Sequence, residues 1–126
     1  MVYGLEHVAL CAKEPKKLVD WYVEYLNFRI VYDNGKGTYF IALPEGDMIE
    51  IFAADIDTDK SSSNGSGLRH LALSVNDFET VVEKLKGAGV QELPELAKVN
   101  DKIKTYFFRD PEGNILHLIY RVDPLY

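Results

Sequence analysis

The chain reads Gly4-Leu5-Glu6-His7-Val8-Ala9-Leu10 near its start and, sixty-three positions later, Gly67-Leu68-Arg69-His70-Leu71-Ala72-Leu73. A second match follows at an offset of sixty-seven, where Tyr39-Phe40 and Pro44-Glu45-Gly46 return as Tyr106-Phe107 and Pro111-Glu112-Gly113. Self-similarity of this kind indicates a duplicated structural unit. The sequence therefore predicts two copies of one module.

Length and composition limit what such a chain can be. Its 126 residues suit one ordinary domain, and a hydrophobic content of 47% predicts a packed core that both copies share. The net charge of −6 argues against nucleic acid or an anionic membrane as a partner, because both need a basic face. No apolar run approaches the roughly 20 residues of a membrane helix. We expect a cytoplasmic protein without an internal disulfide, since Cys11 is the only cysteine.

The first copy, residues 1–54, has the pattern of strand, helix and three further strands. Residues 4–11 alternate with a period of two, which predicts a strand with His7 and Cys11 on one face. A helix is expected to begin near Pro15 and to end at Asn27, which tolerates a left-handed cap. The apolar face of this helix is predicted to carry Leu18, Trp21, Tyr22, Tyr25 and Leu26. The strands that follow are predicted at 28–32, 38–43 and 47–53.

The second copy, residues 67–126, repeats this order after a Ser- and Gly-rich linker at 55–66. Asn76 and Glu79 have the spacing of a helix N-terminal capping pair, and Gly87 and Gly89 predict the end of that helix. The buried helix face is expected to carry Phe78, Val81, Val82 and Leu85, and strands are predicted at 68–75, near 90–93, at 104–109 and at 114–121. The fold class is therefore α+β, with two tandem βαβββ modules that form a shared cleft.

The three histidines of the chain all lie in the repeated segments. His7 and His70 occupy equivalent positions on the first strands, and Glu50 and His117 occupy equivalent positions on the last strands. A carboxylate between two isoleucines is costly to bury unless it is paired or bound to a metal. Imidazole and carboxylate are the ligands of zinc, nickel, cobalt, manganese or iron. We therefore predict that these four side chains meet on one concave face as a divalent metal site.

These segments resemble the vicinal oxygen chelate superfamily, which includes glyoxalase I, bleomycin-resistance proteins, extradiol dioxygenases and fosfomycin-resistance proteins. The resemblance covers essentially the whole chain. It rests on five runs of sequence: residues 5–10, 20–28, 49–51, 68–73 and 108–114. It implies two U-shaped modules around one cleft and metal ligation by His7, Glu50 and His70. It also implies a homodimer that binds a small-molecule substrate.

His117 departs from the glyoxalase pattern, in which this position is usually Glu. Imidazole still binds a metal, but a divalent ion with one carboxylate ligand keeps a charge of about +1. The departure leaves Glu50 as the one ligand that can act as a general base. It also fits extradiol dioxygenases poorly, because in those relatives the carboxylate of the ligand triad comes from the position that His117 holds here.

Side chains in phase with the four ligands are expected to line an apolar pocket suited to a small organic ligand. We predict that the substrate contacts Cys11, Phe52, Ser74 and Ile119. Arg69 and Arg121 are out of phase with the ligands and are expected to face solvent. No basic cluster suited to a phosphonate is evident.

Three functions follow from this pattern. The leading hypothesis is a glyoxalase I-like lyase or isomerase, in which a metal polarises a carbonyl or vicinal-oxygen substrate and Glu50 transfers a proton. A non-catalytic binding protein of the bleomycin-resistance type is the second. A fosfomycin-resistance-type transferase or hydrolase is the third and ranks below the others, because it needs a cationic cluster.

Overall fold

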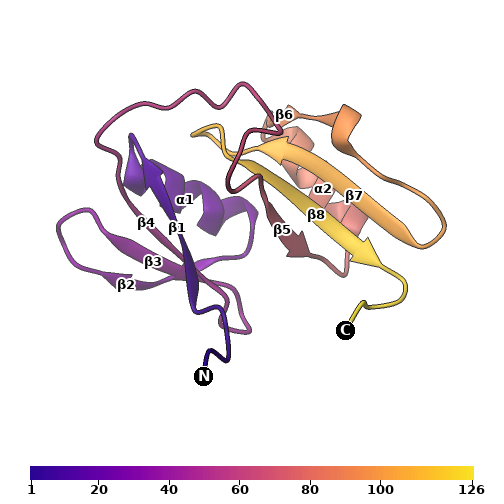
Figure 1. Cartoon of the computed structure of the whole chain (residues 1–126), viewed down its shortest axis with the longest axis horizontal. Coiled ribbons are helices and arrows are strands. Elements are labelled where there is room, and N and C mark those ends of the chain that lie inside the picture. The colour runs from indigo at the N-terminus through magenta and orange to yellow at the C-terminus, as the bar shows by residue number, and fades with distance from the viewer. The chain divides into compact units, whose positions relative to one another are not determined.

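The computed structural model describes all 126 residues. The chain divides into two compact units, Met1–Thr58 and Asp59–Tyr126. Each unit contains one four-stranded sheet with one α-helix packed on it (Figure 1). The two modules confirm the predicted α+β class with the order βαβββ. No helix has the length and apolar character that crossing a membrane requires.

The first unit contains a mixed sheet. Its strands run in the spatial order β1-β4-β3-β2, with β1 parallel to β4 and the other pairs antiparallel. The helix α1 follows β1 and packs against all four strands. The elements are β1 (His7–Ala12), α1 (Pro15–Tyr25), β2 (Arg29–Asp33), β3 (Tyr39–Ala42) and β4 (Met48–Ala53).

The two faces of β1 differ in burial, as the alternating sequence predicts. Ala12 is fully buried, whereas His7 and Cys11 on the other face are exposed. The core on the α1 side includes Leu18, Val19, Tyr22, Leu26, Phe28, Ile41, Ile49 and Ile51. The face that carries His7 is therefore the one that α1 leaves open.

The ends of α1 follow the sequence signals. Pro15 is the first helical residue, where a missing N–H leaves no hydrogen bond unmade. Asn27 has a φ of 62° and so takes the left-handed conformation that was predicted for it. Trp21 and Tyr25 are only half-buried and contact each other with ring centroids 5.5 Å apart. Val19, which the periodicity did not include, is buried instead.

The second unit repeats the architecture with the spatial order β5-β8-β7-β6. Strand β5 pairs with β8 in parallel, and β8-β7 and β7-β6 are antiparallel. The elements are β5 (Leu71–Ser74), α2 (Phe78–Gly87), β6 (Gln91–Glu92), the 3-10 turn η1 (Pro94–Leu96), β7 (Ile103–Arg109) and β8 (Ile115–Arg121).

Two local expectations for the second unit are wrong. The strand predicted at 68–75 is shorter, so His70 lies immediately before β5 and not within it. The predicted capping pair does not form either. Asp77 precedes α2 without a side-chain capping bond, and the Glu79 carboxylate instead accepts a hydrogen bond from Lys104 Nζ at 2.6 Å. Glu79 therefore pairs with a cation on β7 and does not form a reciprocal capping pair with Asn76.

The Pro-Glu-Gly turns of the two copies have the same geometry. Gly46 N donates to Leu43 O at 2.9 Å, and Gly113 N donates to Asp110 O at 2.9 Å. Both glycines have positive φ, 104° for Gly46 and 89° for Gly113, which a side chain would strain. These turns set the register of β3 against β4 and of β7 against β8.

A segment without a counterpart in the first unit covers one face of the second sheet. Leu93 and the half-buried Leu96 pack against Phe107 and Ile115. Thr105 Oγ1 donates to Lys98 O at 3.1 Å and accepts from Lys98 N at 2.7 Å. This face, which also carries His117, is therefore more buried than the matching face of the first unit.

Candidate metal centre

In the first unit, His7 and Glu50 lie together on the open face of the sheet. Glu50 stands opposite Ala9 in the parallel pairing of β1 with β4. Ala9 is two residues beyond His7, so it lies on the same face of β1. The His7 Nε2 lies 3.6 Å from the Glu50 Oε1. The His7 Nδ1 contacts the Glu6 carboxylate. A proton on Nδ1 held by Glu6 leaves the Nε2 lone pair directed towards Glu50, as a metal ligand requires.

In the second unit, His70 and His117 form the matching pair. Their ring centroids are 4.6 Å apart and their planes meet at 77°. His117 is buried, and its Nδ1 lies 3.2 Å from the Leu118 carbonyl oxygen. If Nδ1–H donates to this carbonyl, Nε2 keeps its lone pair.

The two pairs have the same surroundings. Glu50 has Ala9 as its neighbour on one adjacent strand and Phe40 on the other. In the same way, His117 has Ala72 and Phe107 as its neighbours. Phe40 contacts His7 edge-on with centroids 5.1 Å apart, and Phe107 contacts His70 edge-on at 5.5 Å. The duplication therefore reproduces an arrangement of side chains, and its two copies differ at the position of Glu50 and His117.

Burial keeps the imidazoles of the second unit neutral. Desolvation lowers the pKa of His70, and the nearby Arg69 guanidinium lowers it further. Desolvation also lowers the pKa of His117, with His70 as the next cause. Both rings are therefore neutral near pH 7, the protonation state that binds a metal.

The donor types and spacing fit a divalent cation. Two ligands of one tetrahedral zinc ion lie about 3.3–3.6 Å apart, given metal–ligand bonds of about 2.0–2.2 Å. The His7–Glu50 distance of 3.6 Å is at the upper end of this range. Within the structure no group of three or more His, Cys, Asp or Glu side chains is arranged to hold a metal ion. Each unit thus supplies a pair of donors.

His70 differs from the other donors in its hydrogen bonding. Arg69 Nη1 lies 3.4 Å from His70 Nδ1, and Arg69 can only donate. This contact favours a proton on His70 Nε2. Ligation through Nε2 would require the proton to move to Nδ1, and the contact with Arg69 would then be released.

The predicted substrate contacts also occur as register pairs. Cys11 stands opposite Phe52 on the His7 face of the first sheet. Ser74 stands opposite Ile119 on the His117 face of the second. Cys11 and Ser74 are exposed, whereas Phe52 and Ile119 are half-buried. Phe52 and Ile119 lie two residues beyond Glu50 and His117, whereas Cys11 and Ser74 lie four residues beyond His7 and His70.

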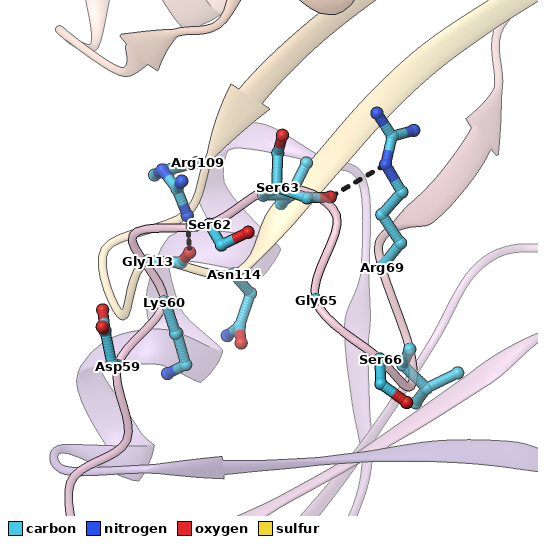
Figure 2. Close-up of a pocket in the computed structure, with 12 residues that line it drawn as sticks. Asp59, Lys60, Ser62, Ser63, Gly65, Ser66, Arg69, Arg109, Gly113 and Asn114 are labelled. Carbon is cyan, nitrogen blue, oxygen red and sulfur yellow. Dashed lines mark hydrogen bonds between the residues drawn. The ribbon is translucent and has the colours of Figure 1, made fainter.

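The sequence reasoning missed a cavity of about 210 Å³ in the second unit. Figure 2 shows the segment from Asp59 to Arg69 curving over the turn between β7 and β8. Lys60, Arg69 and Arg109 are among its lining residues. Arg69 is exposed, as expected, yet it lines a pocket. Ser- and Gly-rich composition indicates a spacer, and only Lys60 and Arg69 near its ends hinted at a binding role.

Comparison with known proteins agrees with this architecture. A glyoxalase family protein from Enterococcus faecalis has a solved structure that is 31% identical, with a TM-score of 0.74, covering 93% of this chain and 97% of that one. The fosfomycin resistance protein FosX of Listeria monocytogenes is 23% identical over 94% of this chain and 90% of its own. One of its solved structures, a complex with Mn(II) and sulfate, matches with a TM-score of 0.76 and covers 99% of this chain and 94% of that one.

A biphenyl-2,3-diol 1,2-dioxygenase from Rhodococcus globerulus is 25% identical over 89% of this chain, which spans 60% of the dioxygenase. The relatives thus include an oxygenase and an antibiotic-resistance protein. The model of the Glyoxalase/Bleomycin resistance protein/Dioxygenase superfamily matches residues 4–118. With a match over nearly its whole length and the repeated βαβββ module, the chain belongs to this superfamily, also called the vicinal oxygen chelate superfamily.

Proposed function

We propose that His7, Glu50, His70 and His117 together hold one divalent metal ion, in an enzyme of the glyoxalase I type. The observation that carries the proposal is the shared register, Ala9 opposite Glu50 and Ala72 opposite His117. A structural histidine needs no partner at the pseudo-equivalent position of another sheet. The repetition of a donor pair in both units supports metal binding by all four side chains.

The substrate class proposed is a small molecule with a carbonyl or two vicinal oxygens. When bound, a divalent ion supplies Lewis-acid polarisation of such oxygens. Cys11, Phe52, Ser74 and Ile119 flank the donors and would contact the rest of the substrate. Phe52 and Ile119 are half-buried apolar side chains, which suit a ligand with an apolar part. A homodimer is the proposed assembly.

Glu50 is the proposed general base. It is the one carboxylate among the four donors, and its side chain remains partly exposed on the open face of the sheet. Glu50 would take a proton from the carbon next to the polarised carbonyl and return it to the neighbouring carbon, which makes the reaction a lyase or isomerase step. With a single carboxylate the site keeps more positive charge than a two-carboxylate site, which favours ionisation of the substrate.

The first measurement is the identity and amount of metal bound per chain. Purified protein would be analysed for zinc, nickel, cobalt, manganese and iron, then stripped and reconstituted with each. We expect about one ion per chain and a large loss of affinity in His7→Ala and His70→Ala. A chain that binds none of these ions would overturn the metal proposal and would favour a non-catalytic binding protein of the bleomycin-resistance type.

The role of Glu50 needs a separate test. Glu50→Gln keeps an oxygen donor but removes the base, so turnover of the methylglyoxal–glutathione hemithioacetal should fall about 100-fold or more while most of the metal stays bound. Glu45→Gln, in the exposed Pro44-Glu45-Gly46 turn, is the matched control. Undiminished turnover in Glu50→Gln would remove Glu50 from the mechanism.

A second candidate is metal-dependent opening of an epoxide, as in fosfomycin resistance. Two observations favour it: the similarity to FosX, and the cations Lys60, Arg69 and Arg109 around one cavity, a cluster that the sequence did not reveal. Reconstituted protein should be assayed in parallel with fosfomycin, with and without an added thiol. Consumption of fosfomycin, with no reaction of the hemithioacetal, would assign the chain to this activity.

A further inference from the structure

The cavity of the second unit is a small, half-open depression. Its volume of about 210 Å³ is below the roughly 300 Å³ at which pockets begin to take drug-sized molecules, so only a small group would fit. All of its walls belong to the second unit. They are Asp59, Lys60, Ser62, Ser63, Gly65, Ser66, Leu68, Arg69, Arg109, Gly113, Asn114 and Ile115.

Positive charge dominates this lining. Three cations, Lys60, Arg69 and Arg109, stand against the single carboxylate of Asp59, although the chain as a whole carries a net charge of −6. Asp59 is turned to its own loop, where it accepts a hydrogen bond from Ser61 N at 2.8 Å. No carboxylate in the structure forms an ion pair with any of the three cations. The lining of the cavity therefore carries a net positive charge, although the chain as a whole is acidic.

The hydrogen bonds of the three cations use only part of their N–H donors. Lys60 Nζ donates to Glu112 O at 3.1 Å, and Arg109 Nη1 donates to Gly113 O at 2.7 Å. Arg69 Nε donates to Ser63 O at 2.9 Å, a bond drawn in Figure 2. Arg69 Nε also donates to Asn64 Oδ1 at 2.9 Å, so all the acceptors are neutral backbone or amide oxygens. An ammonium has three N–H donors and a guanidinium five, so each cation keeps further donors.

Small polar side chains lie between the cations. Figure 2 shows Ser62 and Asn114 in the space bounded by Lys60 on one side and Gly65 on the other. Hydroxyl and amide groups donate hydrogen bonds to oxyanions, and bonds to an ionised partner are about twice as strong as neutral ones. Asn114 Nδ2 already donates to Asp110 Oδ2 at 2.9 Å, so one of its two N–H donors is left for a ligand. Lys60 lies beside Gly113, because a Cβ at Gly113 would stand 3.6 Å from Lys60 Cδ, an ordinary van der Waals distance.

We infer that this cavity binds the oxyanion group of a small molecule, a phosphate, phosphonate or carboxylate. The three groups share the chemistry that Lys60, Arg69, Arg109 and the serine hydroxyls recognise. None of the four candidate metal ligands lines the cavity, and His70 contacts it only through Arg69 Nη1, at 3.4 Å. The test with metal-free protein therefore separates this inference from the metal proposal. The segment 59–66 is then a binding loop and not a mere connection.

The test uses metal-free full-length protein from which the chelator has been dialysed, since chelators are themselves anions. Inorganic phosphate, methylphosphonate and acetate are titrated separately at constant ionic strength with chloride, and amide resonances are followed by NMR. We expect saturable shifts centred on Gly65 and Gly113. The probe that binds most tightly identifies the group. Shifts no larger than those caused by chloride would overturn the inference.

Matched variants localise the site. Lys60→Gln and Arg109→Gln should each weaken phosphate binding about tenfold or more, because each removes a charge-assisted bond. Lys36→Gln, in the β2–β3 hairpin of the first unit, changes the net charge equally and should leave binding unchanged. Lys60→Arg keeps the charge and should retain most of the affinity. Equal affinity in Lys60→Gln and Lys36→Gln would refute the site, even if Arg109→Gln fails to fold.

Discussion

The imidazole of His117 lies flat against the ring of Phe107, with centroids 4.2 Å apart and an interplanar angle of 14°. Phe107 is its direct cross-strand neighbour, as Phe40 is for Glu50. The stacking and the burial of both rings fix the orientation of His117. Glu50 has the same strand neighbours but a more open face. The two ends of the candidate site therefore differ in burial as well as in charge.

Replacement of His117 by Glu would recreate the two-carboxylate set of glyoxalases in a buried position. Without metal, an unpaired buried carboxylate should lower the free energy of unfolding by about 3 kcal/mol. Bound zinc or nickel should restore most of this loss, since it neutralises the new charge. Chemical denaturation with and without metal measures both effects. His117→Gln, which adds no charge, is the control, and an identical denaturation midpoint of His117→Glu in both conditions would contradict the prediction.

The lowered pKa values of His70 and His117 predict how stability depends on pH. Their folded-state pKa values lie below the unfolded value of about 6.5, so the unfolded chain binds more protons between the two. Stability is therefore complete above about pH 6.5 and is lost as the pH falls towards the folded pKa values. Urea denaturation of metal-free protein from pH 8 to 5 tests this. His117→Gln should show a shallower loss than the native chain; parallel curves would refute the assignment.

Asn27 ends α1 with a φ of 62°. Asn27→Ala should lower the free energy of unfolding by about 1 kcal/mol, because Ala lacks the short polar side chain whose local hydrogen bonding lets Asn occupy the left-handed region. Asn27→Gly should be neutral or slightly stabilising. The matched control is Asn76→Ala, which should change stability by less than about 0.5 kcal/mol, because Asn76 does not cap α2. An equal cost for Asn27→Ala and Asn76→Ala in thermal unfolding would show that the left-handed conformation carries no penalty.

Thr105 anchors the segment that covers the His117 face. Thr105→Val removes the hydroxyl that bonds both Lys98 N and Lys98 O, and should lower the free energy of unfolding by about 2 kcal/mol. Amide hydrogen exchange at Lys98 should become faster. Thr80→Val on the exposed side of α2 controls for the loss of a hydroxyl. Unchanged exchange at Lys98 would mean that the remaining bond from Thr105 N to Lys98 O suffices.

Much of the scaffold was predictable because its signals are local. The alternation of residues 4–11, Pro15 and Asn27 around α1, and the two Pro-Glu-Gly turns each act within a few residues, and the structure shows all of them. The Asn76–Glu79 capping pair is wrong, and the other differences lie at the ends of elements. The strand predicted at 68–75 became Leu71–Ser74, because the residues before Leu71 belong to the loop over the β7–β8 turn.

The candidate site was predictable from the sequence as two pairs, because repetition shows which positions are equivalent. The cavity was not, because its walls come together through non-local bonds. Lys60 reaches Glu112, fifty-two residues away, and no periodicity of the segment 55–66 records that contact. Composition alone makes such a segment look like a spacer. The cover formed by Leu93 and Leu96 was missed because it has no counterpart in the first copy.

Glu50 and His117 occupy equivalent register positions in their sheets, which has a consequence for how such proteins diverge. A side chain at either position meets an alanine on one neighbouring strand and a phenylalanine on the other. One codon change there alters the formal charge of the face and leaves every backbone pairing of the sheet in place. A duplicated module built in this way can therefore change one side chain in one copy while the other copy keeps its own.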